Sequence, residues 1–237
     1  MFASIAHRYD LLNRILSFSF DRRWRYLAVR RLAPSLTNQS LVLDLCTGTG
    51  DLAVELSSVA RVVGCDFCRP MLTLGQEKIV RCKLQNPISF VEGDALYLPF
   101  PAGNFDAVTI AFGLRNLQDY AAGLREIYRV LQPGGSLAIL EFSKPKIPFF
   151  SHLYLFYFNH ILPRIGQYIS GEVGPYSYLP ESVGEFPSPQ GLQRLLHSTG
   201  FLQSSYLSLT LGVVGLYLCR KPREAVVAGG KEVQRQG

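Results

Sequence analysis

A regular alternation of strand-like and helix-like segments between residues 41 and 143 constrains the fold of this chain more than any other sequence feature. Runs rich in Val, Ile and Leu that predict strands occur at residues 41–45, 61–67, 88–95, 105–113 and 136–143. Segments with helical spacing of apolar residues occur at residues 51–60, 69–84 and 119–131, and the sequence QPGG after the last of them predicts a helix stop and a turn. This order predicts βαβ units, and therefore an α/β fold with a parallel sheet covered by helices on both faces.

The segments on either side of this core complete one predicted domain. After a short helix at residues 191–199, two more strand-like runs flank Gly212, and we expect them to pair as an antiparallel hairpin at the sheet edge. Residues 1–40 form a helical lead-in with a basic stretch. Residues 145–187, rich in Pro, Gly and aromatic residues, are interpreted as a substrate-side insertion beside the carboxyl edge of the sheet. We predict a single domain over residues 1–222 and a disordered polar tail over residues 223–237.

Composition and charge narrow the class of protein without identifying it. Apolar residues make up 48% of the 237 residues, which is enough for a large core. The net charge of +6 permits an anionic partner, such as nucleic acid or a lipid head group. Five scattered cysteines do not form the pattern of a secreted disulfide framework, and the first ten residues show no apolar region, so we expect no signal peptide. Polar residues interrupt the most apolar stretch, at residues 147–166, so we expect a cytoplasmic chain without a membrane span.

A glycine-rich turn follows the first predicted strand and opens the next helix. Gly48, Gly50 and Ala53 fit the loose G-x-G-x-x-G/A fingerprint of dinucleotide-binding sites, and Asp66 lies near the place of a ribose-binding acid. S-adenosylmethionine uses strand–turn–helix sites of the same kind. The glycines alone therefore leave both ligands open.

The acidic residues favour S-adenosylmethionine. Asp51 at the helix start would repel a pyrophosphate, whereas the sulfonium and ammonium groups of S-adenosylmethionine are attracted to carboxylates. Two unit charges about 4 Å apart at an effective dielectric of about 20 interact by about 4 kcal/mol before desolvation. Asp44, Asp66 and Asp94 lie at the carboxyl ends of three successive predicted strands, so we expect them to line one edge of the sheet. As an alternative, Asp51 is simply an acid that stabilises a helix N-terminus.

These acids also have specific partners in a bound S-adenosylmethionine. Asp66 can accept from the two ribose hydroxyls, and Asp94 can accept from the adenine amino group. The backbone N–H of Ala95 can then reach a ring nitrogen of the adenine. Carboxylate and backbone groups at these positions would recognise the whole adenosine part of the ligand.

Several motifs resemble those of the ubiquinone/menaquinone-biosynthesis C-methyltransferase family. They are DLCTGTGDLA, CDF…ML, EGDALYLPFPAGNFDAVTIAFGLRN, RVLQPGG, LEFSKP and YSYLPESVGEFP, and the resemblance covers residues 2–221. The glycine loop and RVLQPGG are shared by most class I methyltransferases, whereas FGLRN, LEFSKP and YSYLPESV are more specific. The resemblance implies a class I, Rossmann-like, S-adenosylmethionine-dependent methyltransferase whose seven-stranded sheet is mostly parallel with an antiparallel last strand.

The resemblance also implies an activity and site residues. The activity would be methylation of a polyprenyl quinol ring carbon, commonly that of demethylmenaquinol, with the benzoquinol intermediate of ubiquinone biosynthesis as the alternative. The implied cofactor contacts are Thr49, Asp66, Asp94 and Ala95, beside Asp44, Gly48 and Gly50 of the first strand and its turn. The chain departs from the family at Ala111, where a serine is common, and at Cys46 and Thr47, where two glycines are common.

The chemistry suggests further candidates. A quinol must lose a hydroxyl proton before its ring carbon can attack, so Arg115 after the fourth predicted strand could stabilise the phenolate, and Asn116 could orient a hydroxyl. We expect Arg115 to face the cofactor cleft, and the alternative is that it pairs with a surface acid. Tyr9 and Asp10 could form part of a lid over the cofactor. The alternative is that they are a residue of helix packing and a solvated acid. Weaker candidates lie in the insertion, and core or surface roles are preferred or equally open for them. For a pocket around the ring they are Tyr154, Tyr178 and Glu181, and for a general base they are His152 and His160.

Other readings are less favoured. A lone Cys65-x-x-Cys68 pair lacks the partners of a zinc site, so we expect no metal. The turn after the fourth strand lacks the motifs of nucleic acid methyltransferases, so we expect no nucleic acid partner. The basic, aromatic stretch RRWRYLAVRR instead suggests peripheral association with the inner membrane face, or a solvated helix. A non-enzymatic quinone or lipid carrier would not explain the acids, and the sequence leaves open whether the chain forms a homodimer.

Overall fold

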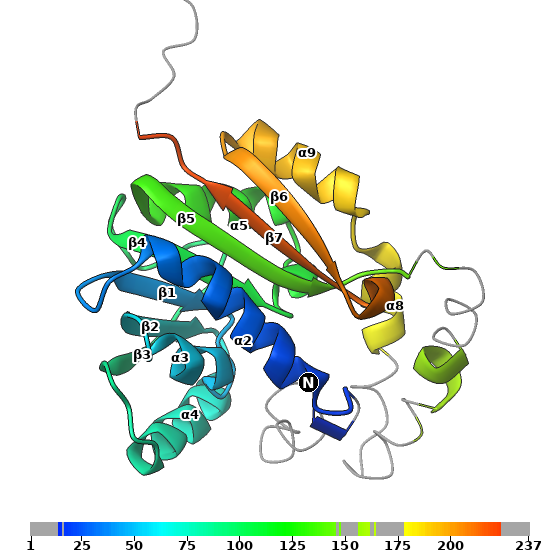
Figure 1. The fold of residues 1–237 in the computed structure, drawn as a ribbon, viewed down its shortest axis with the longest axis horizontal. Coiled ribbons are helices and arrows are strands. Elements are labelled where there is room, and N and C mark those ends of the chain that lie inside the picture. Colours follow the sequence, from blue (N-terminus) through cyan, green and yellow to red (C-terminus); the bar gives the residue numbers. More distant parts are fainter. Residues whose placement is uncertain are drawn as a thin grey trace, which may run out of the picture.

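The computed structural model describes residues 14–15, 17–145, 147, 156–161, 164 and 178–223, and its centre is a seven-stranded sheet (Figure 1). The strands lie in the order β3-β2-β1-β4-β5-β7-β6. Their bounds are β1 (Leu41–Leu45), β2 (Arg61–Asp66), β3 (Ile88–Glu92), β4 (Phe105–Ala111), β5 (Leu131–Phe142), β6 (Leu202–Leu209) and β7 (Val214–Arg220).

The direction of the strands confirms the predicted sheet. β1 pairs in parallel with β2 and β4, and the parallel pairing continues from β2 to β3 and from β4 to β5. β7 is antiparallel to both β5 and β6, and the short turn η4 (Thr210–Gly212) joins the β6–β7 hairpin. The sheet order changes direction at β1 and β4, and in such sheets ligands bind at the carboxyl ends of the strands.

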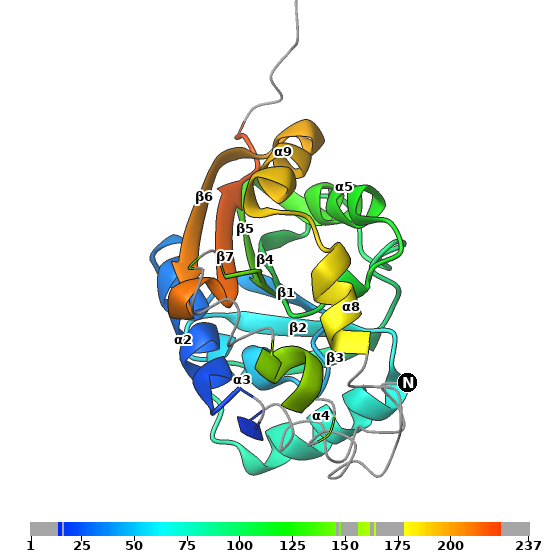
Figure 2. The same ribbon diagram turned by 90° about the vertical axis from the view of Figure 1, so that its right-hand side faces the viewer.

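Helices cover both faces of the sheet because both faces are apolar. Successive residues of a strand point to opposite sides, so Val42 belongs to a core with α2 (Phe20–Leu32) and α3 (Asp51–Leu56), whereas Leu43 belongs to a second core. The helices α5 (Tyr120–Val130) and α9 (Pro189–Thr199) supply that second core. Figure 2 shows α2 and α3 on one side of the sheet and α5 and α9 on the other.

The junction between α5 and β5 differs from the prediction. The helix ends at Val130 as expected, but β5 begins at the next residue, so the four residues QPGG belong to the strand. They form an irregular start, because the register with β4 shifts between Phe105 and Ala107 and Gly134 takes a φ of 82°. Gly135 also has no room for a side chain, since a Cβ there would lie 2.9 Å from the carbonyl oxygen of Gln132. Regular pairing with β4 begins at Ser136, opposite Ala107, which is where the sequence placed the start of the strand.

The carboxyl edge of the sheet carries the remaining elements. α4 (Arg69–Arg81) follows β2, and η2 (Leu114–Asn116) follows β4. Within the insertion, η3 (Tyr157–Ile161) and α8 (Tyr178–Glu185) are described, and α8 packs against η2. No helix in the described part of the chain is long and apolar enough to span a bilayer.

Candidate active site

A cavity of about 280 Å³ opens at the carboxyl ends of the central strands. Its walls come from the ends of β1, β2 and β4, from the turn after β3 and from the start of α4. It brings together six of the residues that the sequence predicts for the site: Gly48, Asp66, Asp94, Ala95, Ala111 and Asn116. Further lining residues that the sequence did not single out are Phe67, Met71, Phe112 and Gln118.

The two glycines of the turn are required for different structural reasons. Gly48 takes a φ of 57°, and a Cβ built on it meets no atom within 4 Å. Gly50 takes a φ of 79°, and a Cβ there would lie 2.7 Å from the ring of Phe90. The same ring would clash with a Cβ on Gly64 at 2.7 Å. Gly50 is therefore needed for packing against Phe90. At Gly48 the missing side chain leaves the backbone open to the space beside the cavity, where a ligand can approach closely.

The departure from the family at Cys46 has a visible structural consequence. Cys46 takes a φ of 55°, a left-handed conformation that favours glycine. Its side chain packs against Gly113, where an added Cβ would lie 2.4 Å from the Cys46 Cβ. The glycine of FGLRN is thus needed to admit this side chain. Phe112 beside it also takes a positive φ, of 57°, so two left-handed residues other than glycine line the cavity.

Asp66 ends β2 and is largely buried. Its Oδ2 accepts from the Gly48 N–H at 2.8 Å, and its Oδ1 accepts from the Cys68 N–H at 2.9 Å. Burial raises the pKa of this carboxyl, and the backbone bonds from Cys68 and Gly48 oppose the rise. The carboxylate therefore joins the glycine turn to the start of α4, and each oxygen keeps a second lone pair for a ligand.

The turn after β3 holds the other predicted adenosine contacts. Asp94 is exposed and accepts from the Leu96 N–H at 2.8 Å through its Oδ1. Ala95 is buried beside it, and both residues line the cavity. The turn thus contributes a carboxylate and a backbone segment to the same cavity as the glycine turn.

Asp44 lies deeper than the sequence implied and does not line the cavity. It accepts from the hydroxyls of Thr47 at 2.6 Å and Thr109 at 2.8 Å. Burial raises its pKa to about 6, the two hydroxyl bonds oppose this, and the charge of Asp66 adds to the rise. Asp44 therefore supports the turn from below and adds negative potential beneath the site.

Thr49 and Gly50 likewise stand outside the cavity lining. Thr49 is 4% exposed, and its hydroxyl accepts from Lys78 Nζ at 2.9 Å. Gly50 precedes α3 as its N-cap. Both residues shape the turn whose Gly48 reaches the cavity.

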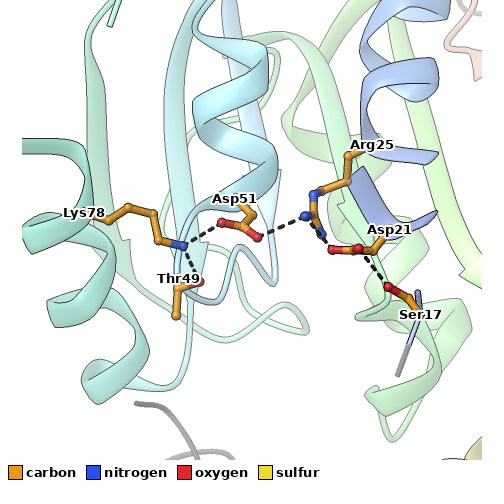
Figure 3. Close-up of polar contacts among 6 residues, drawn as sticks. All are labelled: Ser17, Asp21, Arg25, Thr49, Asp51 and Lys78. Carbon is orange, nitrogen blue, oxygen red and sulfur yellow. Dashed lines mark hydrogen bonds and ion pairs between the residues drawn. The ribbon is translucent and has the colours of Figure 1, made fainter. Parts of the chain in front are cut away.

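The charge argument from Asp51 is corrected by the structure. Its Oδ1 accepts from Lys78 Nζ at 2.6 Å, and its Oδ2 accepts from Arg25 Nη2 at 3.0 Å, as Figure 3 shows. Burial alone would raise the pKa of Asp51, but Arg25 and Lys78 lower it below the ordinary value. Because two cations neutralise this carboxylate, the discrimination between ligand charges rests on Asp44, Asp66 and Asp94.

The expected orientation of Arg115 toward the cofactor cleft is also corrected. Its guanidinium is buried outside the cavity lining, with Nη1 2.8 Å from Oε1 of Glu141, a residue with no exposed surface. It also donates to the Phe112 carbonyl and lies over the Phe142 ring. The acid-pairing alternative therefore describes Arg115, although its partner is buried in the sheet and not at the surface. The pair joins the motifs FGLRN and LEFSKP.

Asn116 follows Arg115 at the end of η2 and lines the cavity. Among the described residues, no partner is found for its buried Oδ1, or for Nε of Arg115. A buried acceptor without a partner is costly, so a polar group that enters the cavity and donates to this oxygen would be stabilised here. The expected role of Asn116 in orienting a hydroxyl is compatible with this position.

The remaining candidates lie elsewhere or outside the described residues. Glu181 and His160 are exposed. Tyr9, Asp10, His152, Tyr154 and the side chain of Tyr178 fall outside the described residues. Cys65 and Cys68 both line the cavity, and burial raises the pKa of Cys65 to about 12, which disfavours its thiolate.

The chain is similar in sequence and in fold to known methyltransferases. The chain is 49% identical to the demethylmenaquinone methyltransferase of Deinococcus radiodurans over 92% of its own length and 90% of that protein. It is 42% identical to the ubiquinone/menaquinone biosynthesis C-methyltransferase of Geotalea daltonii, over 93% and 94% of the two chains. A SAM-dependent methyltransferase from Aquifex aeolicus shares the fold, with a TM-score of 0.59 at 19% identity over 81% and 88% of the two chains.

A family match agrees with these relatives. Residues 1–221 of the 237 residues match the ubiE/COQ5 methyltransferase family, so the match covers all seven strands of the sheet. Three of the motifs quoted above, DLCTGTGDLA, CDF…ML and the segment that ends in FGLRN, contribute residues to the cavity, and Asp66, Asp94 and Asn116 are polar members of its lining. The chain belongs to the ubiE/COQ5 methyltransferase family.

Proposed function

We propose that this protein transfers a methyl group from S-adenosylmethionine to a ring carbon of a polyprenyl quinol, with demethylmenaquinol as its substrate. The observation that carries the proposal is a single cavity lined by Asp66 of β2, by Asp94 of the turn after β3 and by Gly48, where an added Cβ would meet no atom within 4 Å. The methylation of the benzoquinol intermediate in ubiquinone biosynthesis is the alternative, and the names of relatives include both quinones.

The residues around the cavity fit the methyl donor. The donor is a cation with a ribose and an adenine, and the site offers the buried carboxylates Asp44 and Asp66 and the exposed Asp94. The repulsion between Asp44 and Asp66 contributes to the raised pKa of Asp44, so a bound cation would relieve it. In this assignment Asp66 binds the ribose, Asp94 and Ala95 bind the adenine, and Gly48 leaves room for the donor beside its backbone.

The acceptor binds against the wall formed by Ala111, Phe112 and Asn116. Asn116 Oδ1 accepts a hydrogen bond from a quinol hydroxyl and so fixes which ring carbon faces the methyl group. Loss of a hydroxyl proton moves electron density onto the adjacent unsubstituted carbon, which then attacks the methyl carbon as its bond to sulfur breaks. Loss of the hydrogen from that ring carbon and protonation of the oxygen then restore the aromatic quinol. Arg115 acts through Glu141 and the Phe112 carbonyl to position this wall, and Tyr9 contributes to a lid.

The enzyme acts at the inner, cytoplasmic face of a membrane, where the polyprenyl substrate resides. The exposed residues of α2 are all arginine or aromatic: Phe20, Arg22, Arg23, Tyr26, Arg30 and Arg31. The single acid of this helix, Asp21, is buried and paired with Arg25. Such a face attracts anionic head groups, at about 1 kcal/mol for each cation near the surface.

The test is incubation of the purified protein with methyl-labelled S-adenosylmethionine and a panel of reduced quinones, followed by identification of the labelled lipid. Label on the naphthoquinol ring supports the proposal, and label on the benzoquinol supports the alternative. Binding of quinones without any transfer of label would instead support a non-enzymatic carrier.

A further inference from the structure

Five side chains tie the glycine turn to the helices on either side of it, and we call them the Asp51 clamp: Asp21, Arg25, Thr49, Asp51 and Lys78. Lys78 Nζ of α4 donates to Thr49 Oγ1 at 2.9 Å and to Asp51 Oδ1 at 2.6 Å. Arg25 Nη2 of α2 reaches Asp51 Oδ2 at 3.0 Å. Figure 3 shows that the contacts continue through Asp21 to Ser17, so the clamp links three separate segments of the chain.

The clamp holds the side of the turn that faces away from the cavity. Thr49 and Asp51 flank Gly50, and Gly48 lines the cavity one residue earlier. On the cavity side, Asp66 accepts from the Gly48 N–H. Glycine has more conformational freedom than any other residue, so a turn with two glycines depends on such outside restraints for its geometry.

The clamp is nearly closed to solvent and balanced in charge. The side chains of Arg25 and Asp21 are 9% and 5% exposed, and those of Lys78 and Asp51 are each 23% exposed. Two cations face two carboxylates, so the clamp adds no net charge to the cavity. Ion pairs with this burial are more dependent on their geometry than surface pairs, because removing one partner leaves a desolvated charge behind.

We propose that Arg25 and Lys78 are positioning residues for the methyl donor. Neither lines the cavity, and they act by fixing Thr49 and Asp51 so that the Gly48 backbone is preset for the donor. The inference rests on the proposed function, since it takes S-adenosylmethionine as the ligand. It extends that function by making donor affinity depend on α2, the helix that carries the basic outer face.

The experiment compares Lys78→Met with Lys78→Arg, which restores the cation, and with Lys78→Gln, which keeps a donor without charge. Arg81→Met is the control, because Arg81 is an exposed cation in the last turn of the same helix. Calorimetry with S-adenosylmethionine gives donor affinity, steady-state assays give the KM for each substrate, and thermal melting gives stability.

We expect Lys78→Met to weaken donor affinity at least about fivefold, the lower end of typical coupling between distinct sites. The KM for the quinol should stay unchanged, Lys78→Arg should recover most of the affinity, and Arg81→Met should match the wild type. If Lys78→Met does not fold, Lys78→Gln carries the same expectation.

Unchanged donor affinity in Lys78→Met or Lys78→Gln, accompanied only by a lower melting temperature, would assign the clamp to stability and overturn the proposal. An equal loss in Arg81→Met would also overturn it, since net charge alone would then explain the result. Failure of the wild-type protein to bind S-adenosylmethionine would contradict the proposed function itself, which separates the two outcomes.

A double-mutant cycle with Asp51→Asn tests the electrostatic part of the clamp. Lys78→Met leaves Asp51 Oδ1 without its cation while Oδ2 stays paired with Arg25, and if this imbalance displaces the turn, adding Asp51→Asn should return part of the lost donor affinity. Strictly additive losses in the double variant would contradict a clamp that acts through Asp51.

Discussion

Replacement of Arg115 by alanine should destabilise the fold far more than a surface substitution. The variant removes the only cation that the described structure pairs with Glu141, whose Oε1 also accepts from the Phe142 N–H at 2.8 Å and whose Oε2 accepts from the Arg115 N–H at 3.2 Å. Glu141 has no exposed surface, so water cannot take over the role of the guanidinium. Breaking a buried pair in this way costs about 3–5 kcal/mol, against about 0.5 kcal/mol for surface positions.

Urea denaturation followed by circular dichroism measures this loss as a change in the free energy of unfolding. Arg115→Met combined with Glu141→Gln should recover much of it, because the double variant leaves no buried charge without a partner. Turnover separates positioning from direct phenolate stabilisation. Glu141→Gln frees the Arg115 charge, so it should lower kcat if the pair positions the wall of the cavity, and should preserve or raise kcat if Arg115 acts directly on the phenolate.

The reasoning fails if Arg115→Ala changes the free energy of unfolding by less than about 1 kcal/mol, which is within the range of ordinary substitutions. It also fails if Glu141→Gln turns over as fast as the wild type while Arg115→Ala is inactive. That pair of results would return Arg115 to the catalytic role that its place in the sequence suggests.

Four further predictions follow from the donor site and the outer face of α2. Asp66→Ala should weaken S-adenosylmethionine binding by about 3 kcal/mol or roughly 100-fold, because two charge-assisted bonds to the ribose are lost, and calorimetry on the folded variant checks this. Because the folded-state pKa of Asp44 is raised to about 6, its protonated form persists up to that pH, so donor affinity should rise as pH increases through about 6, and Asp44→Asn should flatten that rise. For the same reason Asp44 should make the free protein less stable as pH increases from about 4 to 6, by roughly 3 kcal/mol, and Asp44→Asn should remove this slope in urea titrations. Flotation with anionic liposomes at low salt should retain the wild type, high salt should weaken retention, and Arg22→Gln with Arg23→Gln should reduce it; equal flotation with neutral liposomes at every salt concentration would contradict an electrostatic face.

The fold could be predicted from sequence because its signals are local. The alternation of apolar strands with amphipathic helices predicts the parallel core, and Gly212 marks the final hairpin. The extension of β5 back to Leu131 was not predicted, because a proline and two glycines normally indicate a turn, whereas here they lie in an irregular stretch between the Phe105–Leu131 and Ala107–Ser136 pairs.

The donor site was also largely predictable, because residues at the ends of neighbouring parallel strands meet at one edge of the sheet. Asp66 and Asp94 therefore reach the same cavity, as their positions imply. The ion pairs of Asp51 could not be predicted in this way. Asp51 is separated from Arg25 and Lys78 by 26 and 27 residues, and only the packing of α2 and α4 against the turn brings the three together.

The same limit applies to the second buried pair. Arg115 and Glu141 are 26 residues apart on η2 and β5, and each alone suggests a group directed at solvent or substrate. The glycine of FGLRN is another case, since its reason is the Cys46 side chain of a different strand end. The sequence did carry a signal for the Arg115–Glu141 pair, because the motifs FGLRN and LEFSKP are both specific to the family. That specificity alone does not say which of their residues are in contact.

The most direct test of the proposed function is whether methyl transfer requires the reduced form of the acceptor. An oxidised quinone ring is electron-poor and cannot attack a sulfonium methyl group, and a hydrogen bond from the protein orients the ring without supplying electrons. The purified protein with labelled S-adenosylmethionine and demethylmenaquinone should therefore transfer label only after a reductant such as dithionite is added. Comparable transfer under strictly oxidising conditions would contradict attack by a quinol carbon, and with it the proposed function.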